Sequence, residues 1–260
     1  MKYAIVDGKK REAQKSGELG KCICCGKDTI AHCGKIKVNH WKHKSLQVCD
    51  SWSELETEWH RSWKNQFPSN FQEVVMKDLD SGEKHIADIY NAKQDVVIEI
   101  QNSPITLEEI NSREQYYNKL IWIVNLQPYI DNIKLHENIL NGIYDAVYLF
   151  WQPNLNKRIK ELRNIGNYFE AEKIKNEEDE YYSYLYNKYY FHNSHLVSAE
   201  DDYFLLEWKY QHKRWNYTSA HLFFDFGDSY VYMVLESIKI WNGFIVKRFK
   251  KEKFISKYSK

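Results

Sequence analysis

The sequence predicts a mixed α/β protein, and three observations support this fold class. In the middle of the chain, hydrophobic residues recur first at helical spacing, then in short strand-like runs, then again at helical spacing. Capping and turn residues separate these segments. Of the 260 residues, 43% are hydrophobic and 28% are charged, so the chain can bury a core without disulfides and is not mostly disordered.

Composition divides the chain into three regions, although no Pro/Gly/Ser linker marks their boundaries. Residues 1–48 are rich in Cys and His, residues 49–153 carry the α/β pattern, and residues 154–260 run from a charged helix to aromatic strands. Because the third region is dense in Tyr, Trp and Phe, we expect it to be an α+β region that packs on the core.

The core is expected to run in the order helix, three strands, helix, strand. Ser53-Glu54-Leu55-Glu56 fits a capping box at the start of the first helix, and Pro68 would end that helix. Thr106-Leu107-Glu108-Glu109, after Pro104, fits a second capping box. The four strands of this order are expected at Phe71–Lys77, His85–Tyr90, Val96–Gln101 and Leu120–Val124, and a further strand at Ala146–Trp151.

In the C-terminal region, a helix is expected over Asn154–Glu178, and a hairpin over Ala220–Phe226 and Ser229–Leu235 around Gly227-Asp228. The basic tail from Lys247 to Lys260 is more typical of a solvated face than of nucleic-acid contact. The net charge is +1, so contact with DNA must come from local basic patches. No apolar run reaches membrane-spanning length and no secretory leader is visible, so we expect a cytoplasmic protein without membrane contact.

All five cysteines lie between residues 22 and 49, which in a reducing compartment favours metal ligation over disulfides. Cys22 and Cys25 form a C-x-x-C pair, and His40 and His43 would share a face if their segment were helical. Two such pairs supply the four tetrahedral ligands that zinc prefers, so we predict one structural Zn²⁺ bound by these four side chains. The alternative is a reduced thiol cluster beside ordinary surface histidines. Residues that could replace one of the four ligands are Cys24, His32, Cys33 and Cys49.

A second group of candidate ligands consists of acids on the predicted strands. Side chains alternate between the faces of a strand, which puts Glu99 and Gln101 on one face. Asp88 of the preceding strand can lie opposite or diagonal to Glu99, and two carboxylates that close repel each other unless a cation lies between them. Mg²⁺ or Mn²⁺ suits such a pair and would activate water against a phosphodiester. Glu73, one strand earlier, is a third candidate acid.

This pattern is the D…E-x-K arrangement of the PD-(D/E)-x-K nucleases, with Gln101 in place of the lysine. Gln101 could hold the attacking water or orient a phosphate oxygen, although it carries no charge. The alternative is a half-exposed sheet whose acids face water.

Several motifs follow one another in a specific order and spacing between about residues 20 and 125. They are Cys22-x-x-Cys25 with His40-Trp41-Lys42-His43, Glu56-Thr57-Glu58-Trp59-His60 followed by Lys64, Ala87-Asp88-Ile89, Ile98–Ile105, and Arg113-x-x-x-Tyr117 with Ile121–Val124. Together they resemble the CoiA-like competence protein family. Two departures from that family are Cys24 inside the cysteine pair and the lack of a proline after Cys22.

The resemblance implies a restriction-endonuclease-like nuclease fold in which Asp88, Glu99 and Gln101 form the catalytic core. It also implies a role in DNA processing, either in recombination during transformation or in mobile elements or defence. The expected partner is DNA, with double-stranded and single-stranded substrates both open. A homo-oligomer and partner proteins of recombination or defence are left open as well.

Three further polar residues receive roles beside these acids. Glu56, His60 and Lys64 recur at a spacing of four and form one helical stripe, which without the resemblance would be a solvated ladder of charges. His60 could act as a general base or contact phosphate, and Lys64 could supply the missing cation or bind nucleic acid. Arg113 could bind a backbone phosphate or form a structural salt bridge.

These observations leave three classes of function. The first is a Mg²⁺-dependent deoxyribonuclease, and the second is a nuclease-fold protein that binds nucleic acid without turnover. The third is a zinc-organised interaction module whose acids are merely exposed. Salt-sensitive DNA affinity separates the first two from the third, and cleavage separates the first from the second.

Overall fold

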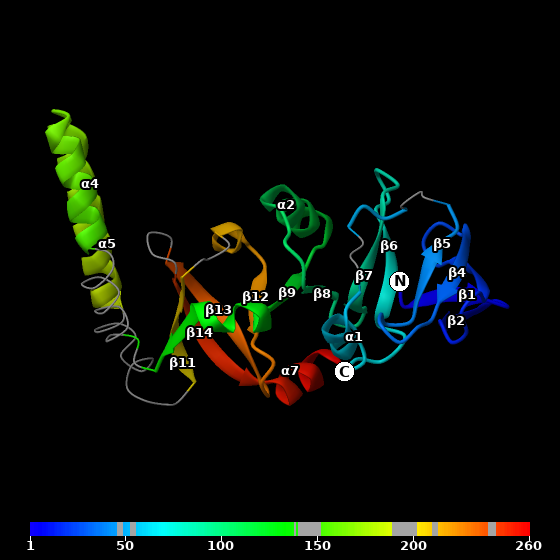
Figure 1. Ribbon diagram of the computed structural model, residues 1–260. Helices are drawn as coiled ribbons and strands as arrows, with labels where there is room; N and C mark the ends of the chain where they lie inside the picture. The colour runs from blue at the N-terminus through cyan, green and yellow to red at the C-terminus, as the bar shows by residue number, and fades with distance from the viewer. Residues whose placement is uncertain are drawn as a thin grey trace. The chain divides into compact units, whose positions relative to one another are not determined.

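The computed structural model describes residues 1–45, 49–52, 56–137, 139, 152–188, 202–209, 213–238 and 243–260 (Figure 1). The chain forms two compact units. Unit 1 comprises Met1–Gln127, Tyr217–Val231 and Lys250–Lys260, and unit 2 comprises Pro128–Asn216 and Tyr232–Phe249. The mixed α/β class is confirmed, whereas the regional boundaries at residues 48 and 153 stay a prediction.

Unit 1 begins with a small antiparallel sheet whose strands run in the order β2-β1-β3-β4-β5. Its core contains Ala4, Ala13, Ala31 and Trp41. Gly20 allows close packing there, because a Cβ at this position would lie 3.1 Å from Ala4 Cβ and from the Trp41 ring. The strands are β1 Tyr3–Val6, β2 Lys9–Glu12, β3 Leu19–Cys22, β4 Asp28–His32 and β5 His40–His43.

The rest of unit 1 is built on a larger sheet, in which its strands run in the order β12-β9-β8-β7-β6. Strands β6, β7 and β8 are antiparallel, whereas β8 pairs in parallel with β9, and β9 with β12. A parallel pair needs a crossover connection, which α2 provides between β8 and β9. The elements are α1 Glu58–Lys64, β6 Gln72–Lys77, β7 Lys84–Asn91, β8 Val96–Gln101, α2 Leu107–Tyr116, β9 Leu120–Asn125, β12 His221–Asp225 and α7 Lys251–Tyr258.

Strands β8 and β9 lie at the centre of this core because both of their faces are covered. Ile98, Ile100 and Trp122 are buried, which agrees with the near-continuous apolar runs typical of buried parallel strands. Helix α7 packs beside α1 through an edge-to-face contact between Trp63 and Phe254, whose ring centroids are 6.1 Å apart (Figure 1).

The strands predicted near residues 71–77, 85–90, 96–101 and 120–124 are confirmed. The second capping box is also confirmed in part, because the Thr106 hydroxyl accepts a hydrogen bond from Glu109 N–H at 3.1 Å. The first helix begins later than predicted, since Thr57 caps it and accepts a hydrogen bond from His60 N–H at 3.2 Å. Residues 53–55 of the first capping box, and the strand predicted over 146–151, lie outside the described residues.

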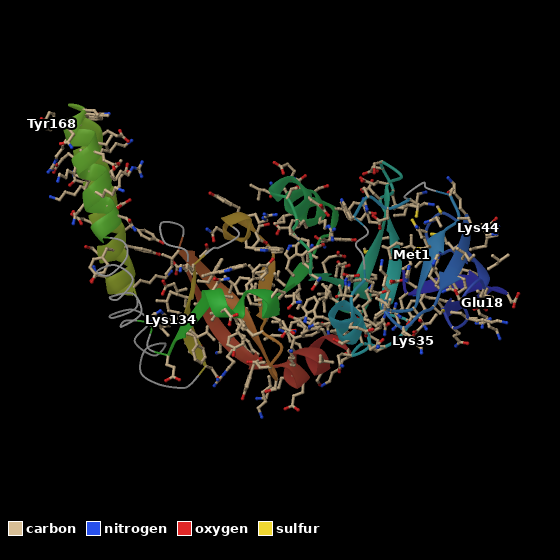
Figure 2. The ribbon with its side chains drawn as sticks, in the orientation of Figure 1. Met1, Glu18, Lys35, Lys44, Lys134 and Tyr168 are labelled. Carbon is tan, nitrogen blue, oxygen red and sulfur yellow. The ribbon has the colours of Figure 1, made fainter. Side chains whose placement is uncertain are left out.

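Unit 2 contains strands in the order β10-β11-β14-β13 and a hairpin of two helices. One helix was expected over 154–178, but Gly166, with φ +78°, separates α4 from α5. Figure 2 shows Tyr168 at the tip of this hairpin. The elements are the 3-10 helix Gln127–Asn132, β10 Ile133–His136, α4 Gln152–Asn164, α5 Tyr168–Asn187, β11 Tyr203–Trp208, the 3-10 helix Lys213–Tyr217, β13 Tyr230–Ile238 and β14 Gly243–Lys250.

Within the hairpin, Leu155 and Ile159 of α4 pack against Ala171 and Ile174 of α5. The strands predicted on either side of Gly227-Asp228 are confirmed as β12 and β13. In the part of the chain that the structure describes, no helix is long and apolar enough to cross a membrane.

Candidate metal centre and acidic pocket

Four metal-ligating side chains meet beside the small sheet of unit 1. The ligand atoms of Cys22, Cys25, His43 and Cys49 all lie within 4.8 Å of one another. Cys22 Sγ lies 3.6 Å from Cys49 Sγ, and Cys25 Sγ lies 3.3 Å from His43 Nε2. Tetrahedral zinc with Zn–S bonds of about 2.3 Å places its sulfur ligands about 3.8 Å apart. The group therefore fits the binding of a metal ion such as zinc.

The turn that carries Cys22 and Cys25 is closed by hydrogen bonds to backbone and sulfur. Cys24 N–H donates to Cys22 Sγ at 3.3 Å, and Gly26, with φ +71°, lets the chain reverse toward β4. Burial disfavours the Cys25 thiolate, but the Lys27 backbone N–H and the Cys22 thiol together hold the pKa of Cys25 below its usual value. The lowered pKa favours a metal-binding thiolate at Cys25, whereas burial raises the pKa values of Cys22 and Cys49, so these two thiols would release their protons on binding an ion.

His40 lies apart from this group, although it was one of the four predicted ligands. Residues 40–43 form strand β5, where side chains three positions apart point to opposite faces. His40 stacks on His32 with ring centroids 5.4 Å apart, and its Nδ1 lies 2.9 Å from Val38 O. The group thus contains three of the predicted ligands, with Cys49 as the fourth member.

The three candidate acids form a row across three neighbouring strands. Gln72 and Val74 of β6 pair with Ile89 and Ala87 of β7, so Glu73 stands at the level of Asp88. Ile89 pairs with Ile98 of β8, so Asp88 in turn faces Glu99. The register therefore places the acids opposite each other and not diagonally.

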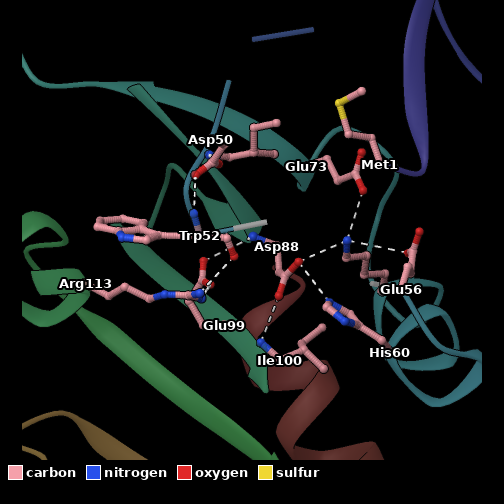
Figure 3. Close-up of a pocket in the computed structure, with 12 residues that line it drawn as sticks. Met1, Asp50, Trp52, Glu56, His60, Glu73, Asp88, Glu99, Ile100 and Arg113 are labelled. Carbon is pink, nitrogen blue, oxygen red and sulfur yellow. Dashed lines mark hydrogen bonds and ion pairs between the residues drawn. The ribbon is translucent and has the colours of Figure 1, made fainter. Parts of the chain in front are cut away.

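Backbone pairing between β7 and β8 stops at this pair of acids. There, the two carboxylates replace backbone carbonyls as the partners of backbone N–H groups. Ile100 N–H donates to Asp88 Oδ2 at 2.9 Å, and Asp88 N–H points to Glu99 Oε1 at 3.4 Å (Figure 3). A cavity of about 60 Å³ lies beside them, which is room for a few water molecules. Its lining residues include Asp50, Trp52, Glu56, His60, Lys64, Glu73, Asp88, Glu99 and Arg113.

Asp88 is held ionised by two basic side chains of α1. Its Oδ1 lies 3.0 Å from His60 Nε2 and 3.0 Å from Lys64 Nζ. Burial opposes ionisation, but these partners and the Ile100 N–H hold the pKa of Asp88 far below its usual range. Figure 3 shows Asp88 between His60 and Glu99.

Glu99 has the opposite electrostatic environment. Burial and the neighbouring Asp88 carboxylate raise the pKa of Glu99 to about 8, and Arg113 offsets only part of this effect. Arg113 Nη1 donates to Glu99 Oε2 at 2.7 Å, and Nη2 contacts Glu109 and Trp52 O. Near neutral pH, Glu99 thus retains a proton in the pocket, where a cation would stabilise its ionised form.

Glu73 connects the small sheet to the pocket. Its carboxylate accepts hydrogen bonds from the backbone N–H groups of Lys2 at 2.7 Å and Tyr3 at 3.0 Å, and from Lys64 Nζ at 3.0 Å. Although burial disfavours ionisation, Lys64 and these donors lower the pKa of Glu73 to about 2. Lys64, surrounded by the carboxylates of Asp88, Glu73 and Glu56, has its pKa raised well above its usual value despite burial.

Gln101 is buried but does not line the acidic pocket. Its amide Nε2 donates to Ser103 O at 2.8 Å, within the turn that follows β8. Arg113 contacts Glu99 at 2.7 Å and pairs with the Glu109 carboxylate, which is the structural salt bridge among its two predicted alternatives. The role expected for Gln101 stays a prediction.

Asp50 and Trp52 are pocket residues that sequence reasoning missed. Asp50 Oδ1 lies 2.9 Å from His85 Nδ1, and Asp50 Oδ2 accepts a hydrogen bond from Ile86 N–H at 2.8 Å. These partners are more than thirty residues away in the chain, so no local pattern could reveal the contacts. The only available signal was that Asp50 directly follows a cysteine of the Cys/His-rich region.

Comparisons with known proteins do not identify a family for this chain. No family model, no curated protein and no solved structure matches it. The resemblance to CoiA-like competence proteins therefore stays a prediction that depends on short motifs.

Proposed function

We propose that the protein is a metal-dependent nuclease that cleaves DNA phosphodiester bonds on a core of the PD-(D/E)-x-K type. The observation that carries this proposal is the Asp88–Glu99 pair, opposed on neighbouring strands at the point where their backbone ladder opens. The pKa values of these two buried carboxylates are strongly shifted, and the pair lies in a pocket with basic side chains, as expected for a catalytic site.

The residues of the pocket fit a hard divalent cation. Asp88 and Glu99 would hold Mg²⁺ or Mn²⁺, which take carboxylate oxygens and keep several waters. The paired carboxylates and the small polar cavity both fit a bound cation, which would displace the proton that the raised pKa of Glu99 retains. When bound, the ion would polarise the phosphate and make hydroxide available at neutral pH.

Lys64 is the residue that would replace the lysine of the usual E-x-K motif. Gln101 carries no charge and lies in the turn after β8, whereas Lys64 Nζ lies 3.0 Å from Asp88 Oδ1. Because its pKa is raised, Lys64 stays charged in the buried pocket. We assign Lys64 the binding of a phosphate oxygen beside Asp88.

His60 is placed to orient water or to accept a proton. Its Nε2 lies 3.0 Å from Asp88 Oδ1, but among the described residues neither this atom nor its buried Nδ1 has a hydrogen-bond partner. A buried ring nitrogen without a partner is costly unless water or a ligand satisfies it. His60 is therefore our candidate for general base or phosphate contact.

The Cys22/Cys25/His43/Cys49 group would hold a structural zinc ion. Four protein ligands with no open position are typical of structural zinc, whereas catalytic zinc keeps one position for water. The two metal sites would thus have separate tasks, with the harder ion at the carboxylates.

One observation favours a second candidate, a DNA-binding protein of the same fold that has lost turnover. Lys64 and Arg113 already pair with the two acids, and the cavity is small. If these pairs persist when DNA binds, no divalent ion reaches the carboxylates. The third class, a zinc-organised interaction module, would show no affinity for DNA.

A cleavage assay with matched variants tests the proposal. Linear, nicked and single-stranded DNA are incubated with the purified protein and Mg²⁺ or Mn²⁺, and Glu99→Gln is compared with Glu108→Gln, an exposed acid of α2. We expect metal-dependent cleavage that Glu99→Gln abolishes and Glu108→Gln preserves. Salt-sensitive binding without cleavage by any of several divalent ions would select the DNA-binding protein.

A further inference from the structure

The short segment Cys49–Trp52 joins the metal centre to the acidic pocket. Cys49 supplies one of the four metal-ligating atoms, and the next residue, Asp50, lines the pocket with only 4% of its surface exposed. Trp52 also lines the pocket. Four consecutive residues therefore span from one site to the other without forming a helix or strand.

Asp50 fixes this segment to strand β7. Its carboxylate contacts His85 Nδ1 at 2.9 Å and accepts hydrogen bonds from Ile86 N–H at 2.8 Å and Trp52 N–H at 3.0 Å. Ile86 precedes Asp88 by two residues on β7. Asp50 therefore helps to fix the position of β7, the strand that carries Asp88.

Trp52 fixes the same segment to the second acid. Its backbone carbonyl accepts a hydrogen bond from Arg113 Nη2 at 2.9 Å, and Arg113 Nη1 donates to Glu99 Oε2 at 2.7 Å. The Arg113 guanidinium also lies 5.5 Å from the centre of the Trp52 ring. This segment therefore fixes the Nη2 side of the Arg113 guanidinium, whose Nη1 contacts Glu99 (Figure 3).

We propose that a thiolate-preferring divalent ion, with zinc the best match, positions the acidic pocket by anchoring Cys49. The bound ion fixes Cys49 and so sets where Asp50 and the Trp52 carbonyl lie. Asp50 and Trp52 are positioning residues, because they act on β7 and on Arg113. The consequence for catalysis rests on the proposed nuclease function, whereas the coupling between the two sites does not.

The coupling is tested by three substitutions and three measurements. Cys49→Ser removes a ligand, Cys49→His replaces it with another that zinc accepts, and Cys33→Ser changes a cysteine outside the group. Metal content, together with the thiolate–Co²⁺ absorption of the cobalt-substituted protein, reports on the centre. Amide hydrogen exchange in β7 reports on the pocket wall.

We expect Cys49→Ser to lose the metal and to speed exchange of the Ile86 amide by about tenfold or more, because its hydrogen bond to Asp50 is lost. Cys49→His should restore both metal and protection, and Cys33→Ser should change neither. Metal loss without any change in Ile86 exchange would overturn the coupling.

A second variant keeps the test decisive if Cys49→Ser fails to fold. Asp50→Ala leaves all four ligands in place, so it should keep its metal and its cobalt spectrum while losing Ile86 protection. It should also weaken Mn²⁺ binding at the acidic pocket by about tenfold, the usual effect of removing support behind a metal ligand. Full Ile86 protection in metal-loaded Asp50→Ala would contradict the proposal.

These outcomes separate this proposal from the nuclease assignment. If wild-type protein neither binds Mn²⁺ at the pocket nor cleaves DNA, the proposed function fails. The coupling still stands in that case when Ile86 protection follows the metal content across the Cys49 variants.

Discussion

Glu99 and Asp88 face each other on neighbouring strands, yet their surroundings shift the two pKa values in opposite directions. The pKa of Asp88 is held far below its usual range by His60 and Lys64, so its ionised form stabilises the folded protein. The pKa of Glu99 is raised to about 8, so its ionised form destabilises the folded protein unless a cation is bound. The two amide variants should therefore differ in stability while sharing a loss of activity.

We expect Asp88→Asn and Glu99→Gln each to abolish cleavage, because ion affinity depends on both negative ligands. Asp88→Asn should lower the free energy of unfolding by about 3 kcal/mol, since it breaks a buried ion pair. Glu99→Gln should leave it within about 1 kcal/mol of wild type, because the neutral amide resembles the protonated form that the raised pKa favours and Arg113 keeps Glu109. Denaturant unfolding and cleavage assays check both results, and equal stability losses would contradict the electrostatic assignment.

The raised pKa of Glu99 also predicts how pH affects metal binding and stability. Between the ordinary pKa of Glu and about 8, the folded protein holds a proton that the unfolded chain releases, so stability from this group falls as pH rises. A divalent ion must displace that proton, so Mn²⁺ affinity should rise about tenfold per pH unit up to about pH 8 and then level off. Calorimetric titration between about pH 6 and 9 measures this, and Glu99→Gln should remove the slope.

At the scale of single elements, the metal centre depends on how strands β3 and β5, the turn after β3 and the segment that carries Cys49 converge. The C-x-x-C turn after β3 was recognisable from sequence because both ligands lie in one local motif. The choice between His40 and Cys49 was not, because it depends on β5 being a strand and on where the chain returns after it. A helix would have placed His40 and His43 on one face, whereas the strand separates them.

The ligand set can be decided by metal analysis of single variants. We expect the Cys22→Ser/Cys25→Ser double variant to lose its zinc, because two of four ligands are removed. His40→Ala should keep one zinc per chain, since His40 contacts His32 and Val38 O and lies outside the group. Zinc loss in His40→Ala with retention in Cys49→Ser would restore the original ligand assignment.

The acidic pocket shows which parts of a site a sequence can predict. Alternation along β8 and the spacing of the β7–β8 connection placed Asp88 near Glu99, since both follow from local strand geometry. The same alternation put Gln101 on the Glu99 face, but Gln101 ends its strand and bonds to the following turn. Contacts such as Lys64 with Asp88 join separate elements, so they depend on how α1 packs against the sheet.

Glu73 of β6 links the start of β1 to Lys64 of α1, and its substitution should lower the free energy of unfolding. Its depressed pKa of about 2 means that its charge stabilises the fold above the ordinary pKa of Glu, and that this contribution is lost as pH falls toward 2. We expect Glu73→Gln to lower the free energy of unfolding by about 3 kcal/mol at neutral pH, because its buried pair with Lys64 is broken. Faster amide exchange at Lys2 and Tyr3 should accompany this loss, and an exposed control, Glu58→Gln, should show neither effect.

At the scale of the whole chain, unit 1 is completed by segments from the C-terminal third. Strand β12 pairs in parallel with β9, and Asn91 Nδ2 donates to Tyr258 O of α7 at 2.9 Å. Asp225 is buried at the end of β12, where its carboxylate accepts hydrogen bonds from the indole N–H groups of Trp59 and Trp63 and pairs with Lys251. The helix that carries His60 and Lys64 therefore depends on residues far along the chain.

This arrangement predicts that residues 1–153 do not fold into a stable core alone. Truncation would remove β12 and leave the edge of β9 unpaired. It would also remove the acceptor of the buried Trp63 indole N–H, at a cost of about 1–3 kcal/mol, and of the half-buried Trp59 indole N–H. Limited proteolysis of the full chain should accordingly release no stable 1–150 fragment, and an expressed 1–153 fragment should lack cooperative thermal unfolding. Adding Asp225→Ala to the full chain should give a milder form of the same defect, with Asp228→Asn as the control in the adjacent turn. A folded, monomeric 1–153 fragment that binds Mn²⁺ as tightly as the full chain would contradict this dependence.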